Sequence, residues 1–341
     1  MINQIYRLVS PRQFEVTYER ESLQTNQVVV RPTHLSICAA DQRYYTGTRG
    51  KEALSKKLPM SLIHEGIGKV VYDPKKEFAS GELVAMIPNT PTEKDDIISE
   101  NYLRSSKFRS SGFDGFMQDY VFLDRDRVVL LGEKINIHVA AFLELITIGV
   151  HAITRFDKKA HSRRNVFGVW GDGNLGYITA LLLKTIYPDS EVVVFGKTEY
   201  KLNHFSFVDE TYQIDNIPQD LIVDHVFECV GGKGSQYAIN QSIDYIAPEG
   251  SISILGVSEY LVEINTRMIL EKGITVIGSS RSGRDDFVKA VKFLNEYPLL
   301  QDYLETLVGS VNEIRSIQDI LDVFENDLTR SWGKTVLEWR I

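Results

Sequence analysis

The sequence predicts an α/β protein of two domains, in which a β-rich domain accompanies a domain built on a doubly wound parallel sheet. The chain has 341 residues, more than one ordinary hydrophobic core accommodates. Up to about residue 147, short β-branched runs are separated by Gly, Pro and Asp, which is typical of strands and turns. Between residues 165 and 281, strand-like and helix-like segments alternate, as they do where helices connect parallel strands.

We expect the β-rich domain at residues 1–147 and 283–341, and the parallel-sheet domain at 148–282. Strands of the β-rich domain are predicted at QVVVRPTHLSIC, GIGKVVYD, ELVAMIP and MQDYVFLD, and its C-terminal part adds a helix and a final strand. The polar stretch 90–111 is expected to be a surface excursion with a short helix. Helical periodicity in INIHVAAFLELITIGVHAI marks the change from one pattern to the other.

Composition excludes several classes of protein. The net charge of −8 argues against nucleic acid as the main partner, because phosphate backbones attract basic surfaces. Two cysteines make no disulfide framework, which favours a reducing compartment. No stretch approaches the roughly 20 apolar residues of a membrane helix, and the N-terminus has no apolar run of signal length. We therefore expect a cytoplasmic protein without membrane partners.

A glycine motif indicates a dinucleotide site. In NVFGVWGDGNLGYITALLLK, Gly171, Gly173 and Gly176 stand between a predicted strand and a predicted helix. The first glycine permits a tight turn, the second lets the backbone approach a pyrophosphate, and the third lets helix pack on strand. The helix N-terminus adds free N–H groups and the positive end of its dipole.

The end of the next strand favours NADP(H) over NAD(H). NAD sites usually carry an acid about twenty residues after the motif, but the strand EVVVF ends in Gly196 followed by Lys197 and Thr198. These residues and Lys201 could meet a 2′-phosphate, although Lys197 could also be a solvated surface lysine. The full set of expected cofactor-binding residues is Gly171, Gly173, Asn174, Leu175, Gly176, Gly196, Lys197, Thr198, Lys201, Val230 and Gly256.

Five segments, in this order, resemble the zinc-dependent medium-chain dehydrogenases and reductases. They are ICAADQRYYTG, PMSLIHEGIGKVV, GFDGFMQDYVFLD, FLELITIGVHA and the glycine motif. The resemblance covers nearly the whole chain and is closest to the sorbitol dehydrogenase-like polyol branch. It implies a GroES-like catalytic domain and a Rossmann domain, and we expect a homodimer.

The resemblance implies a catalytic zinc held by four candidate residues. Cys38 matches the zinc-binding cysteine, His64 and Glu65 match the His-Glu pair, and Glu144 matches the acid that polyol dehydrogenases use in place of a second cysteine. Thiolate, imidazole and carboxylate are good zinc ligands. Taken alone, Cys38 could be a small buried hydrophobic residue and His64 a core histidine, whereas Glu144 in an apolar helix needs a partner. Whether Glu65 or Glu144 binds zinc at rest stays open.

The sequence departs from the family pattern in three places. Residues 90–111 lack the four cysteines of the family's structural zinc, so we expect one zinc per chain. Ala40 stands where a hydroxyl often relays the proton, which leaves zinc-bound water near an acid, Tyr44 or Arg43 as candidate proton routes. Ile63 stands where a glycine usually precedes the His-Glu pair.

Two basic clusters predict a phosphorylated substrate. One follows Cys38 and contains Arg43, Tyr45, Arg49 and Lys51 as well as Tyr44, and the other contains Arg281 and Arg284. Arginine binds phosphate through paired donors, although each of these charges could also be a solvated surface group.

The resemblance extends to the bacterial enzymes that reduce ribulose 5-phosphate for ribitol-phosphate teichoic acid synthesis. It implies NADPH-dependent reduction of D-ribulose 5-phosphate to D-ribitol 5-phosphate, and a cytidylyltransferase partner that makes CDP-ribitol. Three alternatives are a zinc-independent quinone or enone reductase, an NAD-linked polyol dehydrogenase, and a dinucleotide-binding interaction protein without activity. The first and third do not need Cys38, His64 and Glu144 together, and Gly196 argues against the second.

Overall fold

The computed structural model describes all residues from 1 to 341 and divides into two compact units. The first unit comprises Met1–Leu145 and Ser282–Ile341, and the second comprises Ile146–Arg281. These bounds lie within two residues of the predicted domain boundaries. No helix combines the length and the apolar character needed to cross a bilayer.

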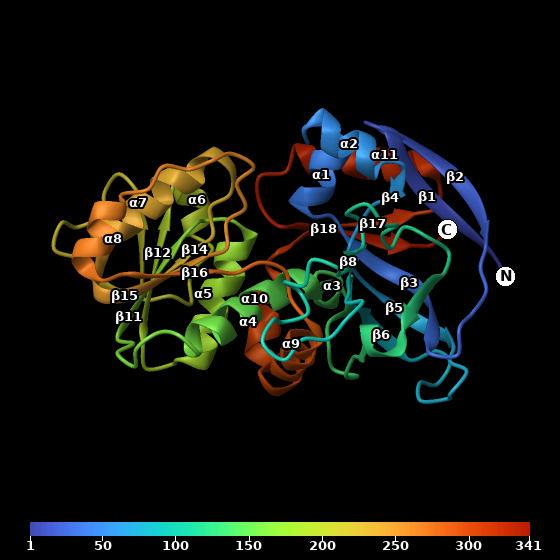
Figure 1. Ribbon diagram of the computed structural model, residues 1–341, viewed down its shortest axis with the longest axis horizontal. Coiled ribbons are helices and arrows are strands. Elements are labelled where there is room, and N and C mark those ends of the chain that lie inside the picture. The colour runs from blue at the N-terminus through green and yellow to red at the C-terminus, as the bar shows by residue number, and fades with distance from the viewer. The chain divides into compact units, whose positions relative to one another are not determined.

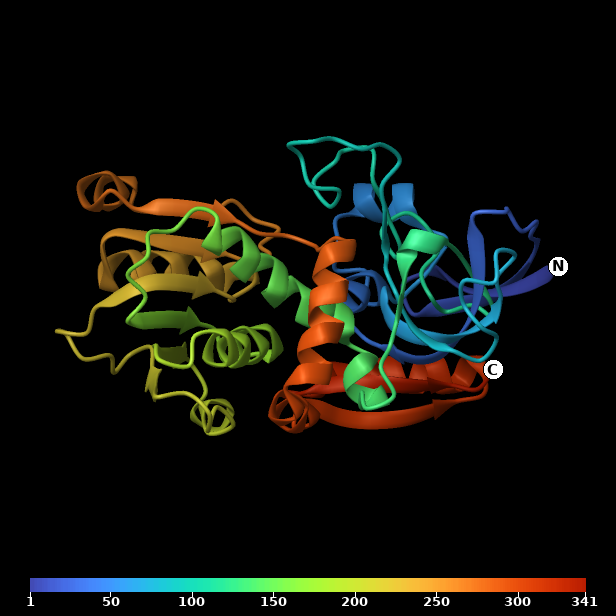
Figure 2. The same cartoon turned by 90° about the horizontal axis from the view of Figure 1, so that it is seen from below.

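The first unit is built on two antiparallel-rich sheets (Figure 1). A seven-stranded sheet has the order β10-β6-β5-β3-β18-β17, with β9 also paired to β3, and a three-stranded sheet has the order β2-β1-β4. The strands of the larger sheet are β3 Gln27–Ser36, β5 Glu65–Tyr72, β6 Leu83–Met86, β9 Val121–Asp124, β10 Val128–Leu130, β17 Val308–Ile314 and β18 Lys334–Trp339. The smaller sheet contains β1 Ile2–Ser10, β2 Gln13–Arg20 and β4 Met60–Ser61. Figure 2 shows β17 and β18, in red, lying side by side at the edge of the larger sheet.

Short helices cover this unit. They are α1 Ala39–Tyr45, α2 Lys51–Lys57, the 3-10 turn η1 Arg125–Arg127, α3 Ile137–Ala140, α9 Arg284–Glu296, α10 Pro298–Glu305 and α11 Ile317–Leu328. Apolar faces of α1 and α11 pack into the core beside the strands, where Tyr45 contacts Phe14 and Phe324 with ring centroids 5.9 and 4.8 Å apart. The C-terminal segment thus completes the core that the N-terminal strands begin.

The polar stretch 90–111 contains no helix, so the predicted short helix is wrong. The segment is a series of turns that opens and closes with the two-residue strands β7 Asn89–Thr90 and β8 Lys107–Phe108. Asp95 accepts the backbone N–H groups of Ile97 and Ile98 at 2.8 and 2.7 Å. Such local bonds from an aspartate side chain compete with helix formation and stabilise turns.

The second unit is a six-stranded parallel sheet of order β13-β12-β11-β14-β15-β16. Its strands are β11 Val166–Trp170, β12 Glu191–Gly196, β13 Glu210–Gln213, β14 Val223–Glu228, β15 Ile246–Ile254 and β16 Thr275–Gly278. Its helical elements are α4 Leu143–Asp157, which begins in the first unit, α5 Asn174–Ile186, α6 Glu199–Leu202, η2 Gly232–Gly234, α7 Ser235–Tyr245 and α8 Thr266–Lys272. Numbered within the sheet, this is the doubly wound order 3-2-1-4-5-6, in which ligands bind at the switch between the first and fourth strands.

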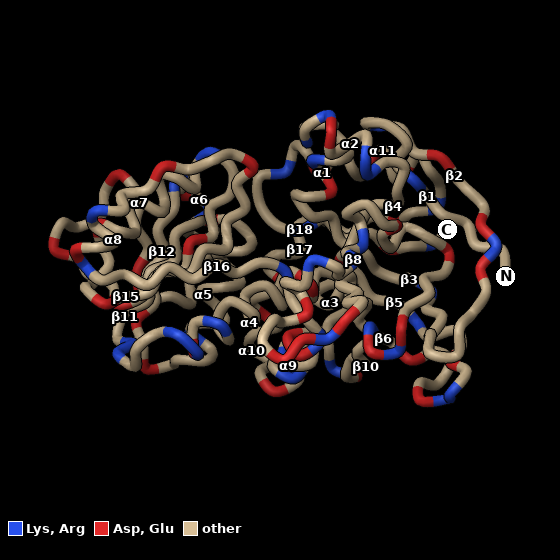
Figure 3. The backbone as a smooth tube through the Cα atoms, viewed as in Figure 1, with Lys and Arg blue, Asp and Glu red and all other residues tan.

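Charged residues are interspersed along both units. Figure 3 shows Lys and Arg segments alternating with Asp and Glu segments rather than gathering in one long basic run.

Candidate active site

The first unit brings three predicted zinc ligands together at the end of two paired strands. Cys38 follows β3 and caps the start of α1, while His64 and Glu65 stand at the start of β5. The register pairs Ser36 of β3 with Glu65, which fixes these two strand ends side by side. The ligand atoms of Cys38, His64 and Glu65 all lie within 4.8 Å of one another.

A fourth residue, Asp41, holds two of these groups in position. Its Oδ2 accepts the backbone N–H of Cys38 at 3.1 Å, and its Oδ1 lies 3.5 Å from Nδ1 of His64. Ser110 donates its hydroxyl to the same Oδ1 at 2.6 Å. The carboxylate is fully buried, so the interaction with the imidazole is poorly screened. A carboxylate behind a metal-binding histidine fixes the orientation of its ring and raises its basicity.

Ile63 shows why the departure from glycine is tolerated. Its φ of 67° is in the left-handed region, where a β-branched residue is strained by about 1–3 kcal/mol. Its backbone N–H donates to Asp41 Oδ1 at 3.1 Å, and its side chain is buried in the core of the first unit. These two interactions stabilise the turn that aims His64.

Lys334 of β18 neutralises Glu65. Its Nζ lies 2.9 Å from each carboxylate oxygen of Glu65 and donates to the carbonyl of Ile37 at 2.6 Å. Both side chains are buried, Lys334 at 4% exposure and Glu65 at 0%. Because Glu65 raises it against the effect of burial, the pKa of Lys334 stays above its usual value.

Glu144 lies in the first turn of α4 and is buried at 5% exposure. Burial raises the pKa of Glu144 to about 7, with His64 lowering it and Glu65 raising it further. The structure therefore places Glu144 within electrostatic range of His64 and Glu65, although its carboxylate is outside the set of atoms within 4.8 Å.

The charges of this region fit a bound dication. Three buried carboxylates, those of Asp41, Glu65 and Glu144, share their surroundings with one buried lysine. Burial by itself would lower the pKa of His64, but Asp41 and Cys38 raise it well above its usual value. Thiolate, imidazole and carboxylate suit zinc, and a bound dication would take the place of the proton on His64 in compensating the buried carboxylates.

The two tyrosines predicted for the active site are buried, and their hydroxyls are hydrogen-bonded to other side chains. Tyr45 is 1% exposed, stacks in the core and donates its hydroxyl to Glu325 of α11 at 2.7 Å, so the predicted substrate contact is corrected to a structural role. Tyr44 is also 1% exposed. Its hydroxyl accepts from Lys57 Nζ at 3.0 Å, and the Arg49 guanidinium lies 4.4 Å from its ring centroid. Both tyrosines lie on the buried side of this short helix.

Of the basic residues predicted to bind the substrate phosphate, Arg284 is also held by structural hydrogen bonds. Arg284 donates through Nη1 to the carbonyls of Asp126 and Val128 at 2.7 and 2.8 Å, which attaches the start of α9 to β10. That geometry favours a structural role for Arg284 over the predicted contact with the substrate phosphate. Arg43 and Arg281 are half-buried, and Arg281 has a φ of 59°.

The second unit contains the predicted dinucleotide turn, and the surroundings of its three glycines differ. Gly171 has a φ of 132°, and a Cβ there would meet Cys229 at 3.1 Å. A Cβ on Gly176 would lie 1.9 Å from the carbonyl oxygen of Gly171, so helix α5 could not approach the turn. A Cβ on Gly173 would meet nothing within 4 Å, which leaves its side of the turn open.

The end of β12 carries a carboxylate that the sequence reasoning missed. Asp172, from the glycine turn, accepts the N–H groups of Lys197 and Thr198 on Oδ2 at 2.9 and 2.7 Å. A Cβ on Gly196 would lie 2.6 Å from the Cβ of Asp172 and 2.7 Å from Leu202. The strand end thus lacks an acid of its own only because a neighbouring acid fills that space.

Glu228 organises the loops after β14 and β15. It is fully buried, and its Oε1 accepts the N–H of Val230 at 2.8 Å while its Oε2 accepts that of Gly256 at 3.3 Å. Both are predicted cofactor-binding residues. Burial raises the pKa of Glu228 to about 7, and the N–H groups of Val230 and Gly256 lower it only in part. Cys229 packs against Gly171, and burial raises the pKa of its thiol.

Comparison with known families agrees with this architecture. Residues 24–133 match the alcohol dehydrogenase GroES-like domain, and residues 183–296 match the zinc-binding dehydrogenase domain. The chain therefore belongs to the zinc-binding dehydrogenase family, with a GroES-like domain and a Rossmann-type domain.

Within that family, the chain is similar to ribulose-5-phosphate reductases along its whole length. It is 66% identical to the ribulose-5-phosphate reductase of Bacillus spizizenii, with all of both chains covered. It is 61% identical to ribulose-5-phosphate reductase 1 of Staphylococcus aureus, with 99% of each chain covered. The crystal structure of S. aureus TarJ in complex with NADPH matches with a TM-score of 0.90 at 55% identity, covering both chains completely.

Four residues of the two sites were absent from the sequence-based prediction: Asp41, Lys334, Asp172 and Glu228. Two of them had a usable signal, since Asp41 follows Cys38 by three residues and Asp172 lies inside the glycine motif. Glu228 offers a weaker one, an acid at the end of an apolar strand. Lys334 has none, because it is 269 residues from its partner Glu65.

Proposed function

We propose that this enzyme reduces D-ribulose 5-phosphate to D-ribitol 5-phosphate with NADPH at a zinc site. The observation that carries the proposal is the buried cluster of Cys38, His64 and Glu65, oriented by Asp41 and Lys334. It occurs in a chain that is 66% identical to a protein named ribulose-5-phosphate reductase. When bound, zinc would polarise the substrate carbonyl as a Lewis acid and NADPH would supply the hydride.

Each residue of the cluster has a proposed role. Cys38 and His64 hold the metal, with Asp41 fixing the imidazole. Glu65 is paired with Lys334, and we propose Glu144 as the acid that alternates with water at the metal. Glu144 also suits the proton route better than Tyr44, because Glu144 interacts electrostatically with His64 and Glu65, whereas the Tyr44 hydroxyl is paired with Lys57.

Arg43 and Arg281 remain the proposed contacts of the substrate phosphate. Both are only half-buried, whereas Nη1 of Arg284, at the start of α9, donates to two backbone carbonyls. Guanidinium groups bind phosphate through paired, charge-assisted hydrogen bonds.

The wider setting is part of the same proposal. We place the enzyme in the cytoplasm, where reduced cysteines are maintained, because both of its cysteines are free. We further propose that it is a homodimer and that a cytidylyltransferase converts its product to CDP-ribitol for wall teichoic acid.

A panel of sugars tests the function. The purified enzyme would be given ribulose 5-phosphate, xylulose 5-phosphate, free ribulose and free xylulose, with NADPH oxidation followed by absorbance. We expect ribulose 5-phosphate to be the preferred substrate by kcat/KM. Equal or faster reduction of the free sugars would contradict the proposal and favour a free-polyol dehydrogenase.

One observation favours a second candidate, an NAD-linked polyol dehydrogenase. Asp172 brings a carboxylate to the end of β12, where NAD enzymes bind ribose hydroxyls. Its Oδ2 already accepts two backbone N–H groups, so we rank this candidate second. A higher kcat/KM with NADH than with NADPH would reverse that order.

A further inference from the structure

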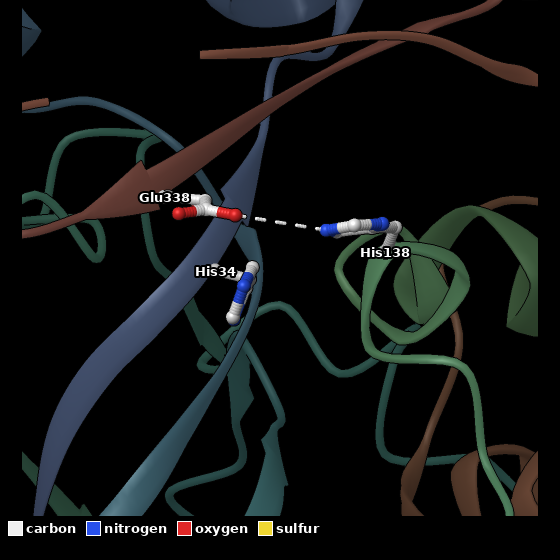
Figure 4. A group of neighbouring side chains, drawn as sticks. All are labelled: His34, His138 and Glu338. Carbon is white, nitrogen blue, oxygen red and sulfur yellow. Dashed lines mark ion pairs between the residues drawn. The ribbon is translucent and has the colours of Figure 1, made fainter. Parts of the chain in front are cut away.

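A second cluster of possible metal ligands lies in the first unit, and none of its members belongs to the site described above. It consists of His34, His138 and Glu338, whose ligand atoms all lie within 4.8 Å of one another. Figure 4 shows the three side chains converging from β3, α3 and β18, with the imidazole of His138 directed at the carboxylate of Glu338. We call these residues the His-His-Glu cluster.

The fold specifies this convergence. His34 and Glu338 are direct partners in the antiparallel pairing of β3 with β18, so their side chains project from the same face of the sheet. The third member comes from α3, whose first residues are fixed by Asn136. The Asn136 side chain accepts the N–H groups of His138 and Val139 at 2.9 and 3.4 Å. Three separate segments are thereby held at one point.

The polar groups of the cluster are incompletely satisfied. His34 is 8% exposed, and its Nδ1 is buried without a hydrogen-bond partner. An unpaired buried polar atom of this kind is uncommon and calls for an explanation. Burial also lowers the pKa of His34, with Glu338 opposing that shift, and a neutral imidazole is the form that binds metals.

The other two members leave room for an ion and a path for its entry. Nε2 of His138 is 3.8 Å from Oε1 of Glu338, beyond hydrogen-bonding distance, and the two side chains are 32% and 27% exposed. The rings of His34 and His138 have centroids 5.7 Å apart. Arg340 pairs with the other oxygen of Glu338 at 3.2 Å, which leaves Oε1 as the oxygen facing the histidines.

We propose that the His-His-Glu cluster is a second metal site that binds a divalent transition metal of the zinc class. Two imidazoles and one carboxylate form a known zinc ligand set with an open fourth position, and Zn–N and Zn–O distances of about 2.0–2.2 Å require ligand atoms about 3.3 Å apart. The ligands must therefore close in by about an ångström or less per residue, which the half-exposed side chains of His138 and Glu338 can do by rotating. The ion would tie α3 to the β3–β18 pair.

This site is distinct from both zinc sites considered from the sequence. It shares no ligand with the Cys38, His64 and Glu65 cluster, and it lies outside residues 90–111. We expected one zinc per chain because residues 90–111 lack the cysteines of a structural zinc site. That reasoning could not reveal a site built from histidine and glutamate. The proposal does not depend on the substrate or coenzyme assigned above.

Metal content measured after zinc loading and gel filtration tests the proposal. We expect two zinc equivalents per chain in the unmodified enzyme, and one each in His138→Ala and Cys38→Ser. Glu338→Gln should reduce zinc retention at the same site, and His204→Ala, which removes an exposed histidine of the second unit, should keep two equivalents. A single equivalent in the unmodified enzyme, or two in His138→Ala, would overturn the second site.

Cobalt substitution assigns each equivalent even if Cys38→Ser does not fold. Co²⁺ bound through Cys38 should show a thiolate charge-transfer band in the near ultraviolet, whereas Co²⁺ in the His-His-Glu cluster should show only visible d–d bands. In His138→Ala we expect the charge-transfer band to persist while one Co²⁺ equivalent and part of the visible intensity are lost. An unchanged visible spectrum and an unchanged cobalt content in His138→Ala would refute the proposal.

Discussion

The ammonium group of Lys334 lies 2.9 Å from both carboxylate oxygens of Glu65, and both side chains are buried. The pair joins β18, near the C-terminus, to the first residue of β5, and so sets the position of one predicted metal ligand from the opposite end of the chain. Breaking a buried pair leaves an uncompensated charge, which is more costly than losing a surface ion pair.

Lys334→Met should destabilise the metal-free enzyme by about 3–5 kcal/mol, because Glu65 would remain buried without its cation. Added zinc should recover part of that loss by supplying positive charge to the same cluster. Urea unfolding with and without zinc measures both effects. Lys69→Met, which removes an exposed lysine from the same strand as Glu65, is the matched control and should change stability little. A Lys334 variant as stable as the Lys69 variant would show that the pair contributes nothing.

Cys38→Ser should lose the catalytic zinc and the activity, since the thiolate is a ligand for which a hydroxyl is a poor substitute. Cys229→Ser should retain the catalytic zinc, because Cys229 lies in the second unit against Gly171, outside the ligand cluster. Elemental analysis and NADPH oxidation give the two readouts. Full activity in a Cys38 variant would mean that the site is misassigned.

Coenzyme choice should depend on the lysines that follow β12. Lys197→Ala combined with Lys201→Ala should lower kcat/KM for NADPH by about tenfold or more and leave the value for NADH nearly unchanged, because a charge-assisted hydrogen bond contributes about 1.5–3 kcal/mol. Lys158→Ala, which removes another exposed lysine of the same unit, is the control.

The simpler variant Gly196→Asp would not test the coenzyme idea cleanly. Its Cβ would lie 2.6 Å from the Cβ of Asp172, so the glycine turn itself would have to shift. Asp172→Asn is sharper, since it removes the negative charge at the end of β12 while keeping an oxygen for the N–H groups of Lys197 and Thr198. We expect it to raise the NADPH-to-NADH ratio of kcat/KM severalfold, and a fall in that ratio would indicate that Asp172 is needed for NADPH binding.

Glu228 should make the enzyme less stable as the pH rises. Its folded pKa of about 7 is above the ordinary 4.5, so the fold favours the protonated acid. The stabilisation from this group is complete below pH 4.5, is lost as the pH rises from 4.5 through about 7, and changes little above that. The shift corresponds to about 3 kcal/mol at about 1.4 kcal/mol per pH unit. Unfolding of the unmodified enzyme and of Glu228→Gln should be compared from pH 5 to 8. The variant should show a flatter profile, and parallel profiles would contradict this account.

The phosphate contact should reside in Arg281 and not in Arg284. Arg281→Ala should lower kcat/KM for ribulose 5-phosphate by about 10- to 100-fold, at about 1.4 kcal/mol per tenfold, with the residual rate on free ribulose little changed. Arg284→Ala should instead lower thermal stability, because it removes bonds to the carbonyls of Asp126 and Val128. An Arg281 variant impaired equally on both sugars would defeat the assignment.

Features that depend only on neighbours along the chain could be predicted from the sequence. The glycine turn, the β12 end and the His64–Glu65 pair are all local, because each needs only a few consecutive residues in the right order. The alternation of strand and helix from residue 165 to 281 likewise predicted the parallel sheet, since a crossover needs a helix between its strands.

Contacts between polar groups that are far apart in the sequence depend on how the elements pack, and the sequence did not reveal them. Tyr45 and Arg284 belong to segments whose basic and aromatic residues predicted a phosphate site. In the structure, the packing of α1 on α11 buries Tyr45 in the core, and Arg284 at the start of α9 donates to backbone carbonyls. Lys334 and Glu338 reach Glu65 and His34 because strand β18 pairs with β3 in one particular register. That register depends on burying the apolar residues of both strands together, a constraint that no short stretch of sequence contains.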